Sequence, residues 1–305
     1  MFAEQKLYVL LVVCVSSASL AAEPGKLDVE QIKRIVGLQG KYNETDGTFK
    51  ITQPRSDVSV AVDGQVMNPF RGLTTWAAFQ NGKRAEAMVM GDIVLFQDEV
   101  NRAMSAALEN GLTVTALHNH FFFDEPKVFF MHIGGEGTTV QLATGVRKVL
   151  DTVREIRAAT GSPGTSFKYP GIPDKSSITP EPIESTLGIK GKSKDGMFKV
   201  SVGRTVTMAC GCKVSAGMGV TTWGAFAGTD DHAVIDGDFA CLPGELQPTL
   251  KTLRRHGINI VAIHNHMEDE EPRVIFLHYW GVGATSDLAR AFKATLNAQK
   301  NARRG

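Results

Sequence analysis

The chain has 305 residues, of which 43% are hydrophobic and 21% are charged. This composition is that of an ordinary globular protein, so a largely disordered chain is excluded, and the length predicts two domains. The 33 basic residues nearly balance the 32 acidic ones, which excludes the strongly basic surface of a nucleic-acid-binding protein.

The N-terminal segment has the pattern of a secretory signal peptide, which we place at residues 1–21. Lys6 precedes an apolar run from Leu7 to Val15, and the small residues Ser19 and Ala21 stand where a signal peptidase reads them. An uncleaved membrane anchor is the alternative. Beyond this segment no stretch of about 18 apolar residues occurs. We therefore expect no transmembrane segment in the mature chain, and a periplasmic or secreted location.

The remaining chain predicts α+β domains, each a mostly antiparallel sheet with two helices. Strands are expected where apolar and polar residues alternate, and helices where apolar residues recur every three or four positions. The predicted strands are 58–62, 74–79, 86–94, 112–120, 127–133 and 200–206, and the predicted helices are 97–109, 140–153 and 286–299.

The domain is present twice in tandem. Residues 116–137 and 262–283 align without a gap and are identical at 11 of 22 positions, with an offset of 264 − 118 = 146 residues. A single long repeat of this kind indicates two domain copies rather than a solenoid. We place the first copy at residues 26–159 and the second at 183–300, joined by a linker at 160–182 that is rich in Gly, Pro, Ser and Thr.

Six of the eight histidines recur at matching positions of the two copies. His118 and His120 are two residues apart, so they point to one face of a strand. If the next hairpin is centred on Glu125, His118 lies directly opposite His132, and the three rings converge. The second copy repeats this pattern around Glu271. The predicted metal ligands are His118, His120, His132, His264, His266 and His278.

Three convergent imidazoles favour a divalent transition metal. Zinc is the first choice, and copper and iron are alternatives. Glu125 and Glu271 are the candidate catalytic acids or bases, because each follows a His-x-His pair. Glu99 and Glu245 are weaker candidates, since negative charge is also favoured in the first turn of a helix.

The same letters have other interpretations. A repeated histidine can be a satisfied core residue, and Val114, Ala116, Val128 and Phe130 share the predicted face of the histidines. The spacing also resembles the first cupin motif, but cupins bring their third histidine from a much later strand. The His-Asn-His letters lack the ββα context of an HNH nuclease.

The two copies differ at their hairpin tips. Phe121, Phe122 and Phe123 in the first copy are replaced by Met267, Glu268 and Asp269 in the second. One copy can therefore keep the chemistry while the other supports it, although a charged hairpin tip is also ordinary solvated surface.

Three cysteines follow the predicted signal peptide. We expect Cys210 or Cys212 to pair with Cys241 after export, with free buried thiols or a soft-metal Cys-x-Cys site as alternatives.

The duplicated His-Asn-His, Glu-Pro and His-x-x-Gly-x-Gly pattern, with Thr-Thr-Trp upstream, resembles the LppY/LpqO-like family of bacterial exported proteins. The resemblance covers about residues 26–300 and implies export and two domain copies, but no reaction. Named members look like lipoproteins, whereas Val13 before Cys14 is bulky for a lipid-attachment site.

Three functions remain open at this point. The first is an exported metal-dependent enzyme, most simply a hydrolase, acting on a small-molecule or cell-envelope ligand. The second is a noncatalytic periplasmic protein that binds a metal or small ligand with the same histidines. The third is a structural envelope protein with a satisfied histidine cluster.

Overall fold

A computed structural model describes residues 27–303. The predicted signal peptide lies outside the described residues. Within them, no helix combines the length and hydropathy of a membrane span.

The two copies share one antiparallel sheet of 12 strands, in the order β1-β2-β5-β6-β9-β7-β16-β18-β15-β14-β11-β10. The order in the first half is mirrored in the second, and the equivalent strands β7 and β16 meet antiparallel at the centre through Leu117 and Ile263. The halves are therefore related by a pseudo-two-fold axis between these two strands. The first half contributes β1 (Gly40–Asn43), β2 (Thr48–Pro54), β5 (Thr74–Asn81), β6 (Ala87–Phe96), β7 (Thr113–His118) and β9 (Val128–Gly137), and the second contributes β10 (Lys192–Lys194), β11 (Met197–Gly203), β14 (Thr221–Gly228), β15 (Ala233–Cys241), β16 (Asn259–His264) and β18 (Ile275–Gly283).

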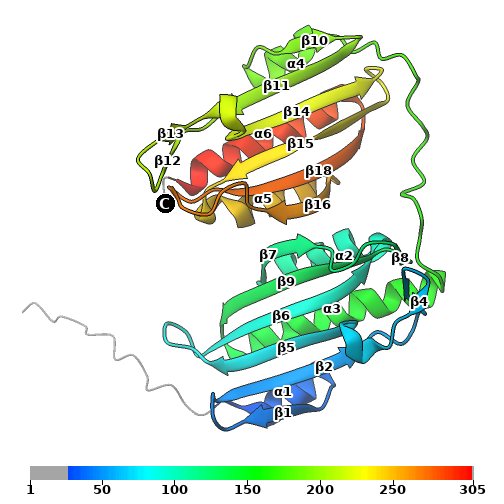
Figure 1. The fold of residues 1–305 in the computed structure, drawn as a ribbon, viewed down its shortest axis with the longest axis vertical. Coiled ribbons are helices and arrows are strands. Elements are labelled where there is room, and N and C mark those ends of the chain that lie inside the picture. The colour runs from blue at the N-terminus through cyan, green and yellow to red at the C-terminus, as the bar shows by residue number, and fades with distance from the viewer. Residues whose placement is uncertain (1–26, 304–305) are drawn as a thin grey trace, which may run out of the picture.

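The helices lie on one face of this sheet (Figure 1), where the main hydrophobic core forms. Two helices of each half were expected, and residues 97–109 are helical as predicted. Each half also begins with an eight-residue helix that the sequence pattern did not indicate, and α4 starts inside the predicted linker. The helices are α1 (Val29–Val36), α2 (Gln97–Glu109), α3 (Thr139–Thr160), α4 (Pro180–Leu187), α5 (Pro243–Arg255) and α6 (Thr285–Ala302).

The other face of the sheet is covered only in part, by two small three-stranded sheets that stand at opposite sides of the view in Figure 1. Each packs its own apolar cluster against the ends of the long strands, around Phe130 in the first half and Phe276 in the second. The rest of this face, which we call the open face, carries the histidines. The small sheets comprise β3 (Ala61–Val62), β4 (Gln65–Val66) and β8 (Asp124–Glu125) in one half, and β12 (Val206–Met208), β13 (Lys213–Val214) and β17 (Glu270–Glu271) in the other.

One helix of each copy, α2 in the first and α5 in the second, forms hydrogen bonds to the central strand of the other copy. The Asn101 amide on α2 donates to the Ile260 carbonyl and accepts from the Ile260 N–H, at 3.2 and 2.7 Å. Gln247 on α5 makes the same two bonds to Val114, at 2.8 and 3.0 Å. Both strands bulge immediately after the residue bonded in this way. These paired bonds satisfy backbone groups that the bulges would otherwise leave unpaired.

Candidate metal centre

The predicted histidines of the first copy do come together on the open face. His118 ends β7, and its ring centroid lies 5.1 Å from that of His120 and 5.1 Å from that of His132 on β9. The predicted register is wrong, because His118 pairs with Phe130 and Ala116 pairs with His132. The error is two residues, so the side chains keep the same face and the rings still meet diagonally.

The bulge in β7 explains a second difference. Val114 was expected to share the face of the histidines, but it packs in the main core on the helix side. The extra residue after Val114 reverses the alternation of the strand, so Ala116 and His118 point to the open face. The histidines are therefore more open to solvent than the sequence pattern predicted.

In the second copy the ring nitrogens face each other. His264 Nε2 and His266 Nε2 lie 3.1 Å apart, and the ring of His264 stacks on that of His278 at 4.8 Å between centroids. Two nitrogens that are each about 2.0–2.1 Å from one metal ion, at angles of about 90–110°, lie about 2.9–3.4 Å apart. The observed separation fits that range.

An aspartate completes this cluster, and the sequence reasoning did not assign it. Asp238 on β15 is 2% exposed, and its Oδ2 lies 3.5 Å from His266 Nε2. Within residues 27–303, Asp238, His264 and His266 are the one set of three or more His, Cys, Asp or Glu groups that could hold an ion, with ligand atoms all within 4.8 Å of one another. Two imidazoles and a carboxylate are a common ligand set for catalytic zinc and for non-haem iron.

Polar atoms around the cluster lack partners. Asp238 Oδ1 and His264 Nδ1 are buried and make no hydrogen bond. By contrast, His278 Nδ1 lies 3.1 Å from the Gly237 carbonyl, which orients that ring as the outer partners of metal ligands do. Unpaired buried polar atoms are costly, so their presence here favours a ligand-binding site over a satisfied core cluster.

Burial and neighbouring groups shift the pKa values of the cluster. Burial, reinforced by His278 and His266, lowers the pKa of His264 to about 4. Burial also raises the pKa of Asp238, although the nearby histidines His278 and His266 oppose that shift. A neutral imidazole is the form that binds a metal, so His264 needs no deprotonation to act as a ligand at neutral pH.

The first copy has the matching aspartate but a different ring arrangement. Asp92 pairs with His132 as Asp238 pairs with His278, and its buried Oδ1 also lacks a partner. The rings of His118 and His120 are nearly parallel, at 17°, whereas those of His264 and His266 are tilted by 45°. Lone pairs lie in the plane of an imidazole ring, so stacked rings direct their nitrogens side by side rather than toward one ion. The second copy is the better arranged of the two.

The proposed proton carriers Glu125 and Glu271 lie in the small sheets. Both are exposed, and within residues 27–303 neither makes a hydrogen bond to a histidine. Their neighbours Asp124 and Glu270 are the buried members of each pair, and these accept from the N–H groups of Val128 and Val274.

Glu99 and Glu245 hold the fold together at the helix starts. Glu99 is fully buried and accepts from the Phe96 N–H and from both terminal nitrogens of Arg55, at 2.8–3.0 Å. Glu245 accepts from the Leu242 N–H and pairs with Arg204. The alternative interpretation of these residues, as groups of the first helical turn, is confirmed.

The predicted disulfide is not formed. Cys210 and Cys212 are free and exposed, while Cys241 is free and buried. Cys241 instead contacts Thr249 and Gln299 through hydrogen bonds. The residues around Cys210 form a turn between β12 and β13.

The two histidine clusters lie side by side on the open face. Leu117 pairs with Ile263 across the centre, so continuing the register sets His118 opposite Ala262 and His264 opposite Ala116. His118 and His264 are then diagonal neighbours on adjacent strands, with their Cα atoms about 7–8 Å apart. A ligand bound at one cluster therefore lies close to the other.

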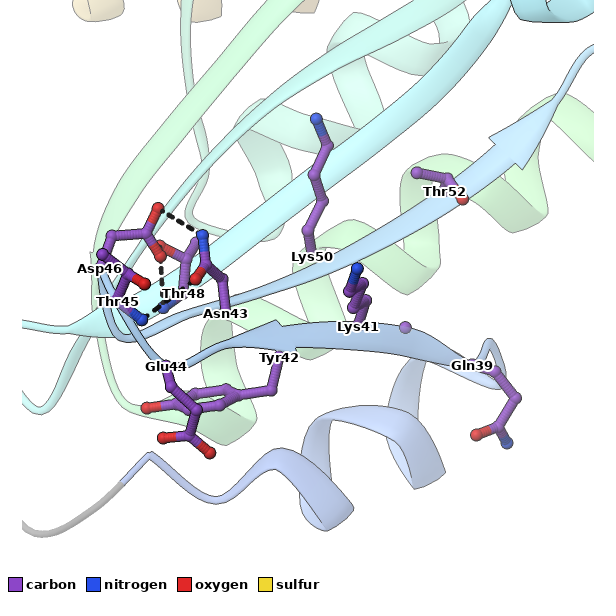
Figure 2. Close-up of a pocket in the computed structure, with 11 residues that line it drawn as sticks. Gln39, Lys41, Tyr42, Asn43, Glu44, Thr45, Asp46, Thr48, Lys50 and Thr52 are labelled. Atoms are coloured by element: carbon purple, nitrogen blue, oxygen red, sulfur yellow. Dashed lines mark hydrogen bonds between the residues drawn. The ribbon is translucent and has the colours of Figure 1, made fainter.

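A hollow of about 940 Å³ lies elsewhere, along the edge hairpin of β1 and β2 (Figure 2). Its polar side chains bond to one another: Asp46 accepts from Asn43 and from Thr48, at 3.1 and 2.6 Å. No histidine lines this hollow.

The chain matches a known family model over both copies. The model is described as Domain of Unknown Function (DUF1259), and it matches residues 30–152 and again 181–298. No curated protein matches the chain significantly. The resemblance to the LppY/LpqO-like family stays a prediction, whereas an uncharacterised family over both repeats is confirmed.

Two solved structures show weak similarity to this chain. A trimeric bacterial microcompartment shell protein, PduB, is 11% identical over 85% of this chain and 89% of its own, with a TM-score of 0.22. The double-ringed trimeric shell protein MSM0271 from the RMM microcompartment is 11% identical over 70% and 82%, with a TM-score of 0.19. Scores this low support no conclusion about this chain. On the match of both repeats to the family model, the chain belongs to the Domain of Unknown Function (DUF1259) family and carries two copies of its domain.

Proposed function

We propose that this chain is a metal-dependent hydrolase whose divalent transition metal is held by Asp238, His264 and His266. The observation that carries the proposal is the 3.1 Å separation of the His264 and His266 Nε2 atoms beside a buried carboxylate with a free oxygen. Zinc fits this donor set best, and iron and copper are the alternatives.

The metal would act as a Lewis acid and would lower the pKa of a water molecule. His278 adjoins the cluster, with its ring centroid 4.8 Å from that of His264. Its Nδ1 contacts the Gly237 carbonyl, which leaves Nε2 to accept a proton. Glu271 is the other candidate for proton transfer, and Glu125 is its equivalent in the first copy. We further propose that His118, His120 and His132, with Asp92, form a weaker second site.

The substrate would be a small-molecule or cell-envelope ligand that docks on the open face. Trp223 lies directly opposite Asp238, and the Lys199 ammonium group lies over its ring, 3.8 Å from the ring centroid. Trp76 and Lys50 repeat this arrangement in the first copy. Aromatic rings and ammonium groups beside the metal suit an anionic or partly apolar ligand. The signal-peptide pattern supports a periplasmic or secreted location.

A noncatalytic metal- or small-ligand-binding protein is the second candidate. His266 retains 35% of its side-chain exposure, and an exposed ligand allows reversible loading and release. The two candidates predict the same metal site but differ in turnover.

Elemental analysis of the purified chain tests the metal site, with His264→Ala beside the matched variant His118→Ala. We expect about one equivalent of metal in the wild type, near-complete loss in His264→Ala and retention in His118→Ala. Titration with Cu²⁺ should quench tryptophan fluorescence, since Trp223 adjoins the site. Equal metal content in all three proteins would remove the proposal.

Turnover separates the enzyme from the carrier. The metal-loaded and metal-free chains are assayed with p-nitrophenyl acetate and p-nitrophenyl phosphate. Metal-dependent hydrolysis that is lost in His264→Ala supports the enzyme. Stoichiometric metal binding without hydrolysis of these probes or of an envelope extract favours the carrier.

A further inference from the structure

The turn between β12 and β13 presents two cysteines to solvent. Met208 closes the turn: its N–H donates to the Cys212 carbonyl at 2.9 Å, and its carbonyl accepts from the Gly211 N–H at 2.8 Å. Gly211 has a φ of 82°, which suits the glycine position of a three-residue hairpin loop. This loop sets Cys210 and Cys212 side by side at the exposed tip.

The two thiols contact each other. Hydrogen bonds from the side chain and the backbone of Cys212 lower the pKa of Cys210, and the same contact raises the pKa of Cys212. Cys241 contrasts with this pair, because burial raises its thiol pKa to about 11 and makes it inert.

Soft and acidic side chains occur elsewhere in this small sheet and in the loop before β17. Met208 and Met267 both pack against the apolar cluster of the second small sheet, and Met208 pairs with Glu270 across β17. Glu268 and Asp269, both exposed, precede β17 in the chain. Acidic groups attract cations and disfavour a second thiolate unless a cation is bound.

The first copy has no equivalent of these thiols. Its β3–β4 hairpin turns through Asp63 and Gly64, with φ values of 49° and 72°, and contains no sulfur. The fold therefore forms this hairpin without cysteines. Exposed thiols at the tip in one copy alone point to a binding role rather than to packing.

We propose that Cys210 and Cys212 form a binding site for a soft monovalent metal ion, with Cu(I) as the fitting ion. Two thiolates suffice for Cu(I), whereas structural zinc takes four ligands. Within residues 27–303, the one group of three or more potential ligands lies at Asp238, so these two sulfurs have no third His, Cys, Asp or Glu group in reach. Binding replaces the thiol protons, which pass to solvent, and changes no oxidation state.

Competition for Cu(I) tests the site on the full chain, kept reduced under anaerobic conditions. Cu(I) is shared with the chelator bicinchoninate, and the affinities of the wild type, Cys210→Ser, Cys212→Ser and His264→Ala are compared. We expect each serine variant to bind Cu(I) at least about 100-fold more weakly than the wild type, and His264→Ala to keep the wild-type affinity. Because both cysteines are exposed, the serine variants should retain the wild-type melting temperature.

Thiol labelling gives a second readout. In the native chain the reagent DTNB should label Cys210 and Cys212 but not the buried Cys241, and one equivalent of Cu(I) should protect both exposed thiols. Equal labelling with and without Cu(I), or equal affinity in the wild type and serine variants, overturns the proposal. Loss of Cu(I) binding in His264→Ala alone would assign the ion to the histidine cluster, which overturns this site but leaves the proposed function standing.

Discussion

Replacing Asp238 with asparagine should stabilise the metal-free protein and remove most of its response to zinc. The carboxylate is 2% exposed, and its Oδ1 has no hydrogen-bond partner. Because the pKa of His264 is about 4, that ring carries no compensating charge at pH 7.5. Asparagine keeps the shape of the side chain and removes the buried charge.

The expected gain follows from the missing partner. An unsatisfied buried polar group costs about 1–3 kcal/mol, and more when it is charged. Without metal, Asp238→Asn should therefore unfold later than the wild type, by about 2–4 °C in melting temperature for each kcal/mol. Zinc at a thousand times its dissociation constant adds about 4.1 kcal/mol to a protein that binds it only when folded. This exceeds the gain of the variant, so the order of stabilities should reverse when zinc is added.

Thermal unfolding with EDTA and with saturating zinc measures both effects. Asp92→Asn is the matched control: its carboxylate is also buried and has an unpartnered Oδ1, but it lies in the copy with stacked rings. This control should gain stability without metal and keep most of the zinc response, because Asp92 belongs to the proposed weaker site. If Asp238→Asn is less stable than the wild type in EDTA, or responds to zinc as strongly, the reasoning fails.

Three further predictions concern stability alone. Lowering the pH from 6.5 to 4 should destabilise the wild type. The pKa of His264 is about 4 in the folded chain and 6.5 for an ordinary histidine, so the unfolded chain binds the proton first. In urea unfolding, the stability of His264→Gln should fall less steeply over this pH range than that of the wild type. Glu99→Ala removes the buried carboxylate that pairs with Arg55 and leaves Arg55 only the half-exposed Asp57 as an acidic partner. It should lower the free energy of unfolding by about 3 kcal/mol in urea, and an unchanged midpoint would contradict the buried ion pair. Asn101→Ala removes both hydrogen bonds to the other repeat. Urea unfolding should show a free energy of unfolding about 1–3 kcal/mol lower than in the wild type, and Gln247→Ala should lower it by the same amount.

The sequence predicts elements well where the signal is local. Residues 97–109 are helical as expected, since their apolar spacing ends at a glycine turn. The register of β7 could not be predicted in the same way. Its bulge is bonded to Gln247, which lies 133 residues away in the chain, so no local pattern records it. The histidines converge nevertheless, because a two-residue shift preserves the face of the strand.

The aspartates were missed for a topological reason, although their signal was present. A Gly-Asp pair recurs in both copies, at Asp92 and Asp238, inside strands that are otherwise apolar. A buried acidic side chain is costly unless it is paired with a cation or hydrogen-bonded, so an acidic residue repeated in a buried strand predicts such a partner. That partner depends on strand order: β9 inserts between β6 and β7, although β7 comes next in the chain after β6 and α2. Sequential strands are neighbours about two-thirds of the time, so the default topology would have set β6 beside β7. The insertion of β9 instead sets Asp92 beside His132, and the same order in the second copy sets Asp238 beside His278. A candidate site of this kind can be found from sequence only if polar residues repeated between copies are collected first and strand order is left open.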